Sequence, residues 1–332
     1  MPTLPLSAKS NVKGDLMRLR SNAIVASTAI IAVVALSACG QLGNLQARKA
    51  FKDANGLYQA QNYHEAAVKY EEAIAASPDS PEGITAYFFL ANSYDNQYKP
   101  ARKGEAENDA YLTKAIANYK ISAERETRPD IKKLALDYLV SAYGPDKLDD
   151  PSQAEPLVQR MIQLDPSDTT NYFALAKIYE DAGNIDEAEA MLMKAKEAKP
   201  KEAAVYQQLA GFYQRQGDFE KLIAAIQQRA DLEPNNPEAH YAVSTYYWDE
   251  AYRNTRLTEP QKREYVKSGL AAVDKAIALN ADYVEALTYR GLLLRIEAAM
   301  EKDAARQKQL LAEATALQEK AVGLKKKQAS GA

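Results

Sequence analysis

The stretch that decides the fold is PSDTTNYFALAKIYEDAGNIDEAEAMLMKAKEAK, residues 166–199, followed by PKEAAVYQQLAGFYQRQGDFEKLIAAIQQRADLE, residues 200–233. The two halves place Tyr, Leu, Ala, Tyr and Gly at the same offsets, and Pro166, Pro200 and Pro234 lie 34 residues apart. Apolar residues three and four positions apart form one stripe along a helix, which can be buried against a neighbour. Proline cannot continue a helix and therefore separates one unit from the next. The stretch predicts repeated pairs of amphipathic helices.

Weaker copies of the pattern continue on both sides, so that residues 47–328 divide into about seven helix pairs. Gly183 and Gly217 stand where the first helix of each regular pair must end, and glycine adopts the left-handed backbone of a helix end at least cost. Asn184, with Glu187 three residues later, predicts a capped start for the next helix. The second, sixth and seventh pairs carry about 11 to 13 extra residues between their helices, and capping chemistry at Thr258 marks the turn of the sixth.

The pattern resembles the tetratricopeptide repeat throughout residues 47–328. In that family small residues let the two helices of a unit approach closely, and a proline closes the unit. The resemblance implies an all-α, right-handed solenoid of about seven helix-turn-helix repeats. Each repeat would bury its apolar stripe only by stacking on its neighbours, which explains why the repeats come as an array.

The N-terminal residues have the composition of a secretory signal. Basic residues precede an apolar stretch from Ala23 to Leu36, and Leu36-Ser37-Ala38-Cys39 follows. The apolar stretch is shorter than the roughly 20 residues that a membrane-spanning helix needs. An uncleaved anchor helix with an incidental cysteine is the alternative interpretation of the same residues.

Leu-Ser-Ala-Cys resembles the bacterial lipobox. The resemblance implies that residues 1–38 are removed as a signal peptide and that Cys39, the one cysteine of the chain, is lipidated. Two or more acyl chains anchor a protein stably in a membrane. We expect residues 39–46 to form a tether, 47–328 the repeat array and 329–332 a flexible tail.

The residue after the cysteine bears on the location. This residue is Gly40. The absence of aspartate at this position resembles the pattern of lipoproteins that are sorted to the outer membrane. We therefore expect a chain anchored by lipid in the cell envelope and facing the periplasm, with the outer membrane favoured over the inner membrane. Met17 is an alternative start to Met1 and would give a signal of ordinary length.

Composition and motifs argue against two classes of function. The whole chain has a net charge of −3, and the part after residue 38 carries 38 bases and 44 acids, whereas nucleic-acid binding needs a basic face. His64 and His240 lie far apart and lack the Cys or His neighbours that a metal site needs. No nucleophile motif or phosphate-binding glycine motif occurs. We predict no nucleic-acid partner, no enzymatic activity, no metal and no cofactor.

Five tyrosines occupy the same position in consecutive units: Tyr94, Tyr143, Tyr179, Tyr213 and Tyr247. We interpret them as packing residues between helices, with the hydroxyl at an edge, and not as ligand residues.

Binding candidates come from the resemblance. In that family the inner side of each first helix, chiefly at positions 5, 9 and 12, lines a concave groove that receives peptides or partner helices. The candidates in this chain are Phe51, Asn55, Tyr58, Phe88, Asn92, Asp95, Phe173, Lys177, Glu180, Gln207, Tyr241, Thr245 and Trp248. Positions 9 and 12 of the last pair are Leu292 and Arg295. Rings at these positions would supply contact area and amides would bond a peptide backbone; the alternative is that the rings cover the inner packing layer.

Two functions therefore compete. The first is a membrane-anchored envelope scaffold that holds a partner peptide or helix in its groove. The second is a structural, self-assembling envelope protein whose long C-terminal hairpins, 248–276 and 287–324, mediate oligomerisation. The sequence leaves open the partner's identity and the oligomeric state.

Overall fold

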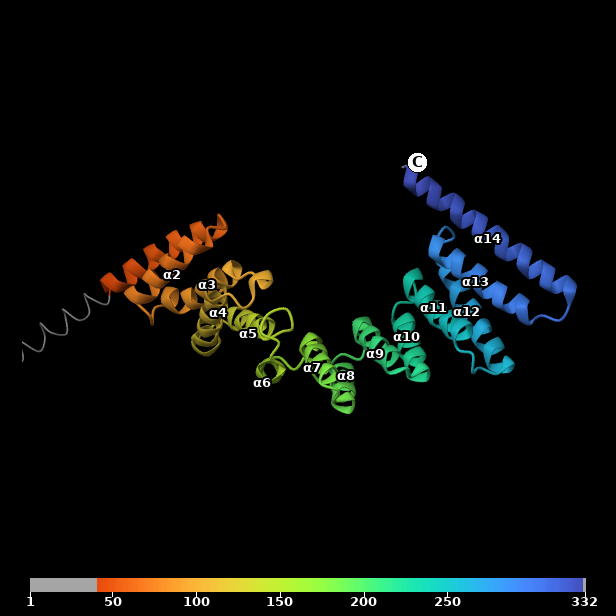
Figure 1. Ribbon diagram of the computed structural model, residues 1–332, viewed down its shortest axis with the longest axis horizontal. Helices are drawn as coiled ribbons and strands as arrows, with labels where there is room; N and C mark the ends of the chain where they lie inside the picture. The colour runs from red at the N-terminus through yellow and green to blue at the C-terminus, as the bar shows by residue number, and fades with distance from the viewer. Residues whose placement is uncertain (1–40, 331–332) are drawn as a thin grey trace, which may run out of the picture. The chain divides into compact units, whose positions relative to one another are not determined.

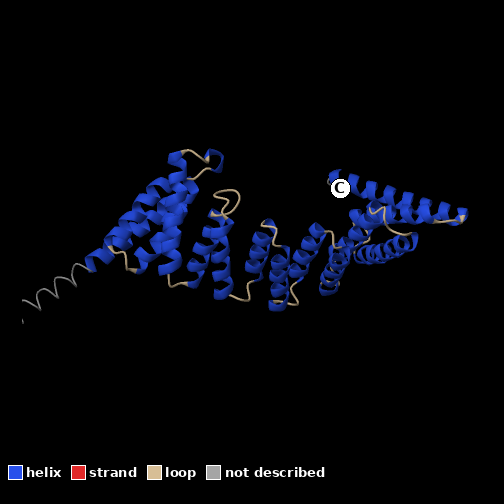
Figure 2. Cartoon of the chain, turned by 60° about the horizontal axis from the view of Figure 1, so that its bottom comes forward, coloured by secondary structure: helices blue, strands red, loops and turns tan. Residues whose placement is uncertain are grey.

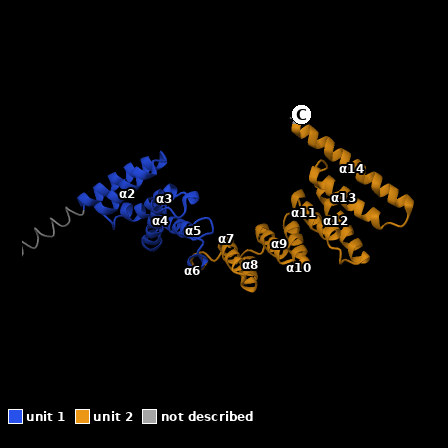
Figure 3. Cartoon of the chain, in the orientation of Figure 1, with its two compact units in different colours: residues 1–157 blue, residues 158–332 orange. Residues whose placement is uncertain are grey.

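The computed structural model describes residues 41–330, and all regular structure in that range is helical (Figures 1 and 2). The prediction of an all-α fold is confirmed. The chain divides into two compact units, residues 1–157 and residues 158–332 (Figure 3).

The first unit opens with a helix over residues 41–59. It continues with α2 (Tyr63–Ala76), α3 (Pro81–Gln97), a 3-10 turn (Pro100–Arg102), α4 (Ala106–Arg125) and α5 (Pro129–Ala142), and α6 (Pro151–Leu164) crosses into the second unit. Helix α2 packs on α3, α3 on α4, and α4 on α5. Proline is the first residue of α3, α5 and α6. The N–H groups of the first turn have no acceptor within the helix, so a proline there removes no hydrogen bond.

The start of the first helix corrects the expected tether. Residues 41–46 are helical, while residues 39 and 40, like the whole expected signal peptide, lie outside the described residues. Packing explains the helix: Ala47 is fully buried, and Gly43 lies so close to the Ala76 carbonyl oxygen that a Cβ would come within 2.7 Å of it. The Ser77 hydroxyl also donates to Oδ1 of Asn44 at 2.7 Å.

The second unit is a run of helices in which each packs on the next. They are α7 (Thr169–Asp181), α8 (Ile185–Ala198), α9 (Ala203–Gln216), α10 (Phe219–Leu232), α11 (Pro237–Arg253), α12 (Glu259–Leu279), α13 (Val284–Met300) and α14 (Ala304–Ser330). Their facing stripes form the core, in which Val205, Phe212, Ile226 and Leu293 have almost no exposed surface.

The 34-residue period has a direct structural cause. The carbonyl oxygens of Pro166, Pro200 and Pro234 are bonded by side chains six residues later: Tyr172 Oη at 3.1 Å, Tyr206 Oη at 2.8 Å and His240 Nε2 at 2.9 Å. Each contact ties the start of a unit to the first helix of that unit. The ring of His240 is therefore a structural group.

The recurring tyrosines join neighbouring pairs, as the packing interpretation predicts. Tyr94 and Tyr213 are buried, and their hydroxyls donate to Glu71 at 2.5 Å and to Glu189 at 2.8 Å. Tyr247 accepts from Nε2 of Gln227 at 3.1 Å. In all three cases the partner lies on the second helix of the preceding pair, so the ring fills the space between repeats and the hydroxyl fixes their register.

The predicted helix ends are mostly confirmed. Gly183 and Gly217 have φ of 79° and 72°, in the left-handed region. Thr258 and Gln261 form a complete capping box. The predicted cap at Asn184 is wrong in one respect: the residue holds the N-cap position, but its side chain makes no capping hydrogen bond.

The extra residues of the sixth and seventh pairs lengthen helices more than loops. Helices α11 to α14 have 17, 21, 17 and 27 residues, whereas α8, α9 and α10 have 14 each. Helix α14 runs to Ser330, so it includes residues 329–330 of the expected tail. None of the helices within residues 41–330 combines the length and the apolar character that crossing a bilayer requires.

Candidate functional site

The polar candidate residues of the first unit bond to other side chains within that unit. The Tyr58 hydroxyl donates to Oδ1 of Asn92 at 2.5 Å, and Nδ2 of Asn92 donates to the Tyr119 hydroxyl at 3.1 Å. Oδ1 of Asn55 accepts from the Tyr70 hydroxyl at 2.6 Å. These amides, which we expected to bond a peptide backbone, already have partners inside the protein.

The remaining candidates in this unit are buried or half-buried. Phe88 and Asn92 are only 5% and 3% exposed, so the structure places them in the packing layer and not on an open groove. Asp95 forms an ion pair of 2.5 Å with Lys147, and little of its side chain is exposed. Phe51 is half-buried, with its ring centroid 5.7 Å from that of Tyr70.

Helices α7 and α9 of the second unit carry the next four candidates. Phe173 is partly buried against the core. Glu180 receives two hydrogen bonds from the guanidinium of Arg215, at 2.7 and 3.0 Å, and Gln207 accepts one from Arg229 at 2.6 Å. Exposed Lys177 pairs with Asp181 one turn later on the same helix. The charged candidates here are engaged within the array.

Helix α11 carries the last three candidates. The Thr245 hydroxyl donates to the Ala242 carbonyl of its own helix at 2.8 Å, so it is already satisfied. The ring of Tyr241 lies 5.2 Å from Tyr283 and 5.3 Å from Tyr289. Burial, together with these neighbouring phenols, raises the pKa of Tyr241 to about 12, and the side chain is therefore a neutral phenol at physiological pH.

Trp248 differs from the other candidates because its ring borders an open hollow. The indole stacks on Tyr252, with centroids 5.2 Å apart and planes 9° apart, and it meets the ring of Tyr289 edge-on at 5.3 Å. We call the adjoining hollow of about 520 Å³ the Trp248 hollow; its lining includes Trp248, Tyr252, Lys262, Leu292, Arg295 and Ile296. These residues come from α11, α12 and α13, which pack on one another (Figure 1).

The sequence pointed to three of the eight residues that line this hollow. Trp248, Leu292 and Arg295 stand at inner positions of the repeat pattern. Tyr252 and Lys262 were missed, since they belong to the extra turns that lengthen α11 and α12 beyond the regular repeat; Ile296, which follows Arg295 within the regular length of α13, was also missed. One signal was present: Trp248 and Tyr252 are four residues apart, which places both on the same face of a helix.

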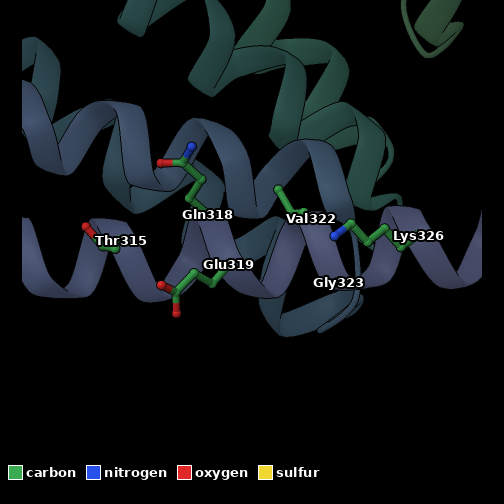
Figure 4. A pocket seen from close by; sticks show the side chains of 6 residues that line it. All are labelled: Thr315, Gln318, Glu319, Val322, Gly323 and Lys326. Atoms are coloured by element: carbon green, nitrogen blue, oxygen red, sulfur yellow. The ribbon is translucent and has the colours of Figure 1, made fainter.

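A second exposed surface lies on α14. Thr315, Gln318, Glu319, Val322, Gly323 and Lys326 line a shallow hollow on one face of this helix (Figure 4). Four of these six carry polar side chains. A polar outer face is what the terminal helix of a repeat array needs to remain solvated.

Among residues 41–330, no group of three or more His, Cys, Asp and Glu side chains is placed to hold a metal ion. The large upward pKa shifts belong to tyrosines such as Tyr94 and Tyr213, where burial is the main cause and a bonded carboxylate adds to it. These shifts follow from helix packing.

Comparison with known proteins identifies the repeat. Residues 147–211 match the family model for the tetratricopeptide repeat. The C-terminal part of a tetratricopeptide-repeat-containing protein from Cytophaga hutchinsonii is similar in structure, with 15% identity, 82% of this chain and 98% of the other covered, and a TM-score of 0.54. A tetratricopeptide repeat protein from Parabacteroides merdae matches at 13% identity, with coverages of 82% and 99% and a TM-score of 0.45. No curated protein matches the chain.

A third solved structure, YrrB, is described as a tetratricopeptide repeat protein with an unusual peptide-binding site. It matches at 20% identity, with coverages of 58% and 89% and a TM-score of 0.39. The family match falls on the regular middle of the chain, and the Cytophaga structure shares the fold over most of its length. These matches, with the contacts that recur every 34 residues, show that residues 147–211 are tetratricopeptide repeats and that the chain shares the fold of a tetratricopeptide repeat array.

Proposed function

We propose that this protein is a non-enzymatic scaffold of the bacterial cell envelope, anchored by lipid on Cys39, which binds a protein partner through the Trp248 hollow. The observation that carries the proposal is the stack of partly buried Trp248 on exposed Tyr252 beside an open hollow. The other candidate side chains of the groove are buried or engaged with neighbours, so among the candidates Trp248 borders the unused contact surface.

Energetics favour a binding role for this stack. Tyr252 is 64% exposed, although removing an aromatic ring from water is favourable. Trp, Tyr and Arg are the residues most enriched among those that dominate protein interfaces. Leu292 and Ile296 extend the apolar surface into the hollow. A partner side chain seated there would bury all four side chains together.

The anchor rests on the N-terminal sequence. Leu36-Ser37-Ala38-Cys39 supports lipidation, and Gly40 supports transport to the outer membrane, with the array on the periplasmic side. Since the first helix is already formed at residue 41, the array would begin very close to the anchored residue.

Self-assembly through the C-terminal hairpin receives less support. Leu311 and Val322 of α14 are 40% and 46% exposed, but the face around Val322 is mainly polar (Figure 4). Stable homodimer interfaces are more apolar than the average protein surface. The face fits the solvated end of an array better.

A pull-down tests the proposal. Full-length protein and its Trp248→Ala variant are purified from detergent extracts of the native cells, with Met193→Ala, an exposed apolar residue of α8, as the matched control. We expect at least one protein to accompany the wild type and the Met193 variant and to be absent from the Trp248 variant. Identical partners for all three would refute binding at the hollow.

A further inference from the structure

We propose that the Trp248 hollow takes an acidic segment, in which a large apolar side chain is flanked by carboxylates. This inference rests on the proposed function and names the chemistry of the partner at the same site. It follows from the two cations of the lining, Lys262 and Arg295.

Three carboxylates of the surrounding helices are already paired with other cations. Asp249 pairs with Arg253 at 2.7 Å, Glu259 with Arg263 at 2.8 Å, and Glu297 with Arg306 at 3.8 Å. Within residues 41–330, no carboxylate lies within ion-pair distance of Lys262 or Arg295. The lining therefore contains two cations that form no ion pair with a carboxylate in that range, although the chain as a whole is acidic.

The donors available there suit carboxylates. Arg295 gives one hydrogen bond, from Nη2 to Oε1 of Gln318 at 2.9 Å, and a guanidinium has five N–H donors in a fork that matches a carboxylate. Lys262 adds an ammonium group from α12, the second helix of its pair, outside the inner positions of the repeat. A basic segment would be repelled by both groups, so the charge selects among partners as well as attracting them.

The apolar part of the hollow requires an anchor beside those carboxylates. Trp248 and Tyr252 present a stacked pair of rings, and Leu292 and Ile296 line the same space. A phenylalanine, tryptophan or leucine side chain would fill it, while a purely acidic peptide would leave the apolar surface in contact with water. The fitting partner is an acidic segment with one or two large apolar residues.

Selection from a random 12-residue peptide library displayed on phage tests this chemistry. The target is the full-length chain in mild detergent, after depletion of the library on the Trp248→Ala variant. Tyr252→Ser, which changes an exposed residue, serves as a second variant in case the tryptophan change disturbs folding, and circular dichroism checks both. The affinity of selected peptides is followed by the fluorescence of Trp248, the only tryptophan of the chain.

We expect the selected peptides to be enriched in Asp and Glu around an aromatic residue or leucine. The double variant Lys262→Gln/Arg295→Gln should weaken their binding roughly tenfold, and raising the salt concentration should weaken wild-type binding. Peptides that require Trp248 or Tyr252 but are neutral or basic, or that keep their affinity in the double variant, would overturn the inference and leave the proposed function standing. If the selection yields no peptide whose binding depends on Trp248 or Tyr252, both this inference and the proposed function are overturned.

Discussion

Replacing Glu126 with glutamine should weaken the first unit by an amount that depends on pH. Glu126 follows α4 and is only 3% exposed. One of its oxygens accepts from the backbone N–H groups of Thr127 at 3.0 Å and Arg128 at 3.1 Å. The other accepts from the Thr85 hydroxyl at 3.2 Å and from Nη2 of Arg128 at 3.1 Å. The carboxylate thus joins α3, the end of α4 and the start of α5.

The expected loss at neutral pH is about 2 kcal/mol. Hydrogen bonds to a charged group each contribute roughly 1.5–3 kcal/mol, and a neutral amide oxygen keeps about half of that from the same donors. The guanidinium of Arg128 is half exposed, so solvent screens its share of the attraction. Burial opposes ionisation of Glu126, but the bonds from Arg128 and Thr85 outweigh it, and the pKa of Glu126 is lowered.

The direction of this shift fixes the pH dependence. Because the pKa is lower in the folded chain than in the unfolded chain, the stabilisation is complete above the unfolded value of about 4.5 and is lost as the pH falls through the folded value. Urea unfolding of wild type and Glu126→Gln, followed by circular dichroism between pH 7 and pH 3, should show two free energies of unfolding that converge in acid. Amide hydrogen exchange at pH 7 should place the effect in α3 to α5.

Glu124→Gln is the matched control, since Glu124 is an exposed residue in the last turn of α4. It should change the free energy of unfolding by less than about 0.5 kcal/mol. A loss for Glu126→Gln that stays constant from pH 7 to pH 3, or one no larger than the control's, would refute the assignment of a charge-dependent junction.

Three further predictions concern the repeats and the anchor. Gly217→Ala should lower the free energy of unfolding by about 1 kcal/mol, because φ is 72° there, whereas Gly211→Ala inside α9 should raise it by up to about 1 kcal/mol; equal effects in thermal unfolding would contradict this. Tyr213→Phe removes the bond to Glu189 and should cost about 1 kcal/mol; an unchanged unfolding midpoint would mean that the hydroxyl does not join the repeats. Cys39→Ser should abolish lipid attachment and cleavage before residue 39, and an unchanged mass and membrane association would exclude the anchor.

The helical fold was predictable because it depends on local pattern. The 34-residue spacing of Pro166, Pro200 and Pro234 and the glycines at positions 183 and 217 act within single units, and the structure confirms both. What the pattern could not give is where extra residues go. The sequence pattern does not distinguish an insertion that forms a loop from one that adds helical turns. In α11 to α14 the extra residues lengthen the helices.

The candidate site was only partly predictable for the same reason. Repeat positions tell which side of a helix a residue occupies, and Trp248, Leu292 and Arg295, all at inner positions, line one hollow. They do not tell whether that side is open: Phe88 occupies an inner position and is buried, because neighbouring rings cover it. Tyr252 lies beyond the regular repeat, so no repeat position pointed to it.

Site-specific photo-cross-linking in the native cells tests the central claim, binding at the Trp248 hollow, most directly. A photoreactive phenylalanine replaces Tyr252 in one strain and Met193 in another, since both positions are exposed on the second unit. We predict a cross-linked species of defined mass from position 252 that disappears when Trp248→Ala is added, and none of that mass from position 193. The same species from both positions, or one at position 252 that persists without Trp248, would contradict binding at this hollow.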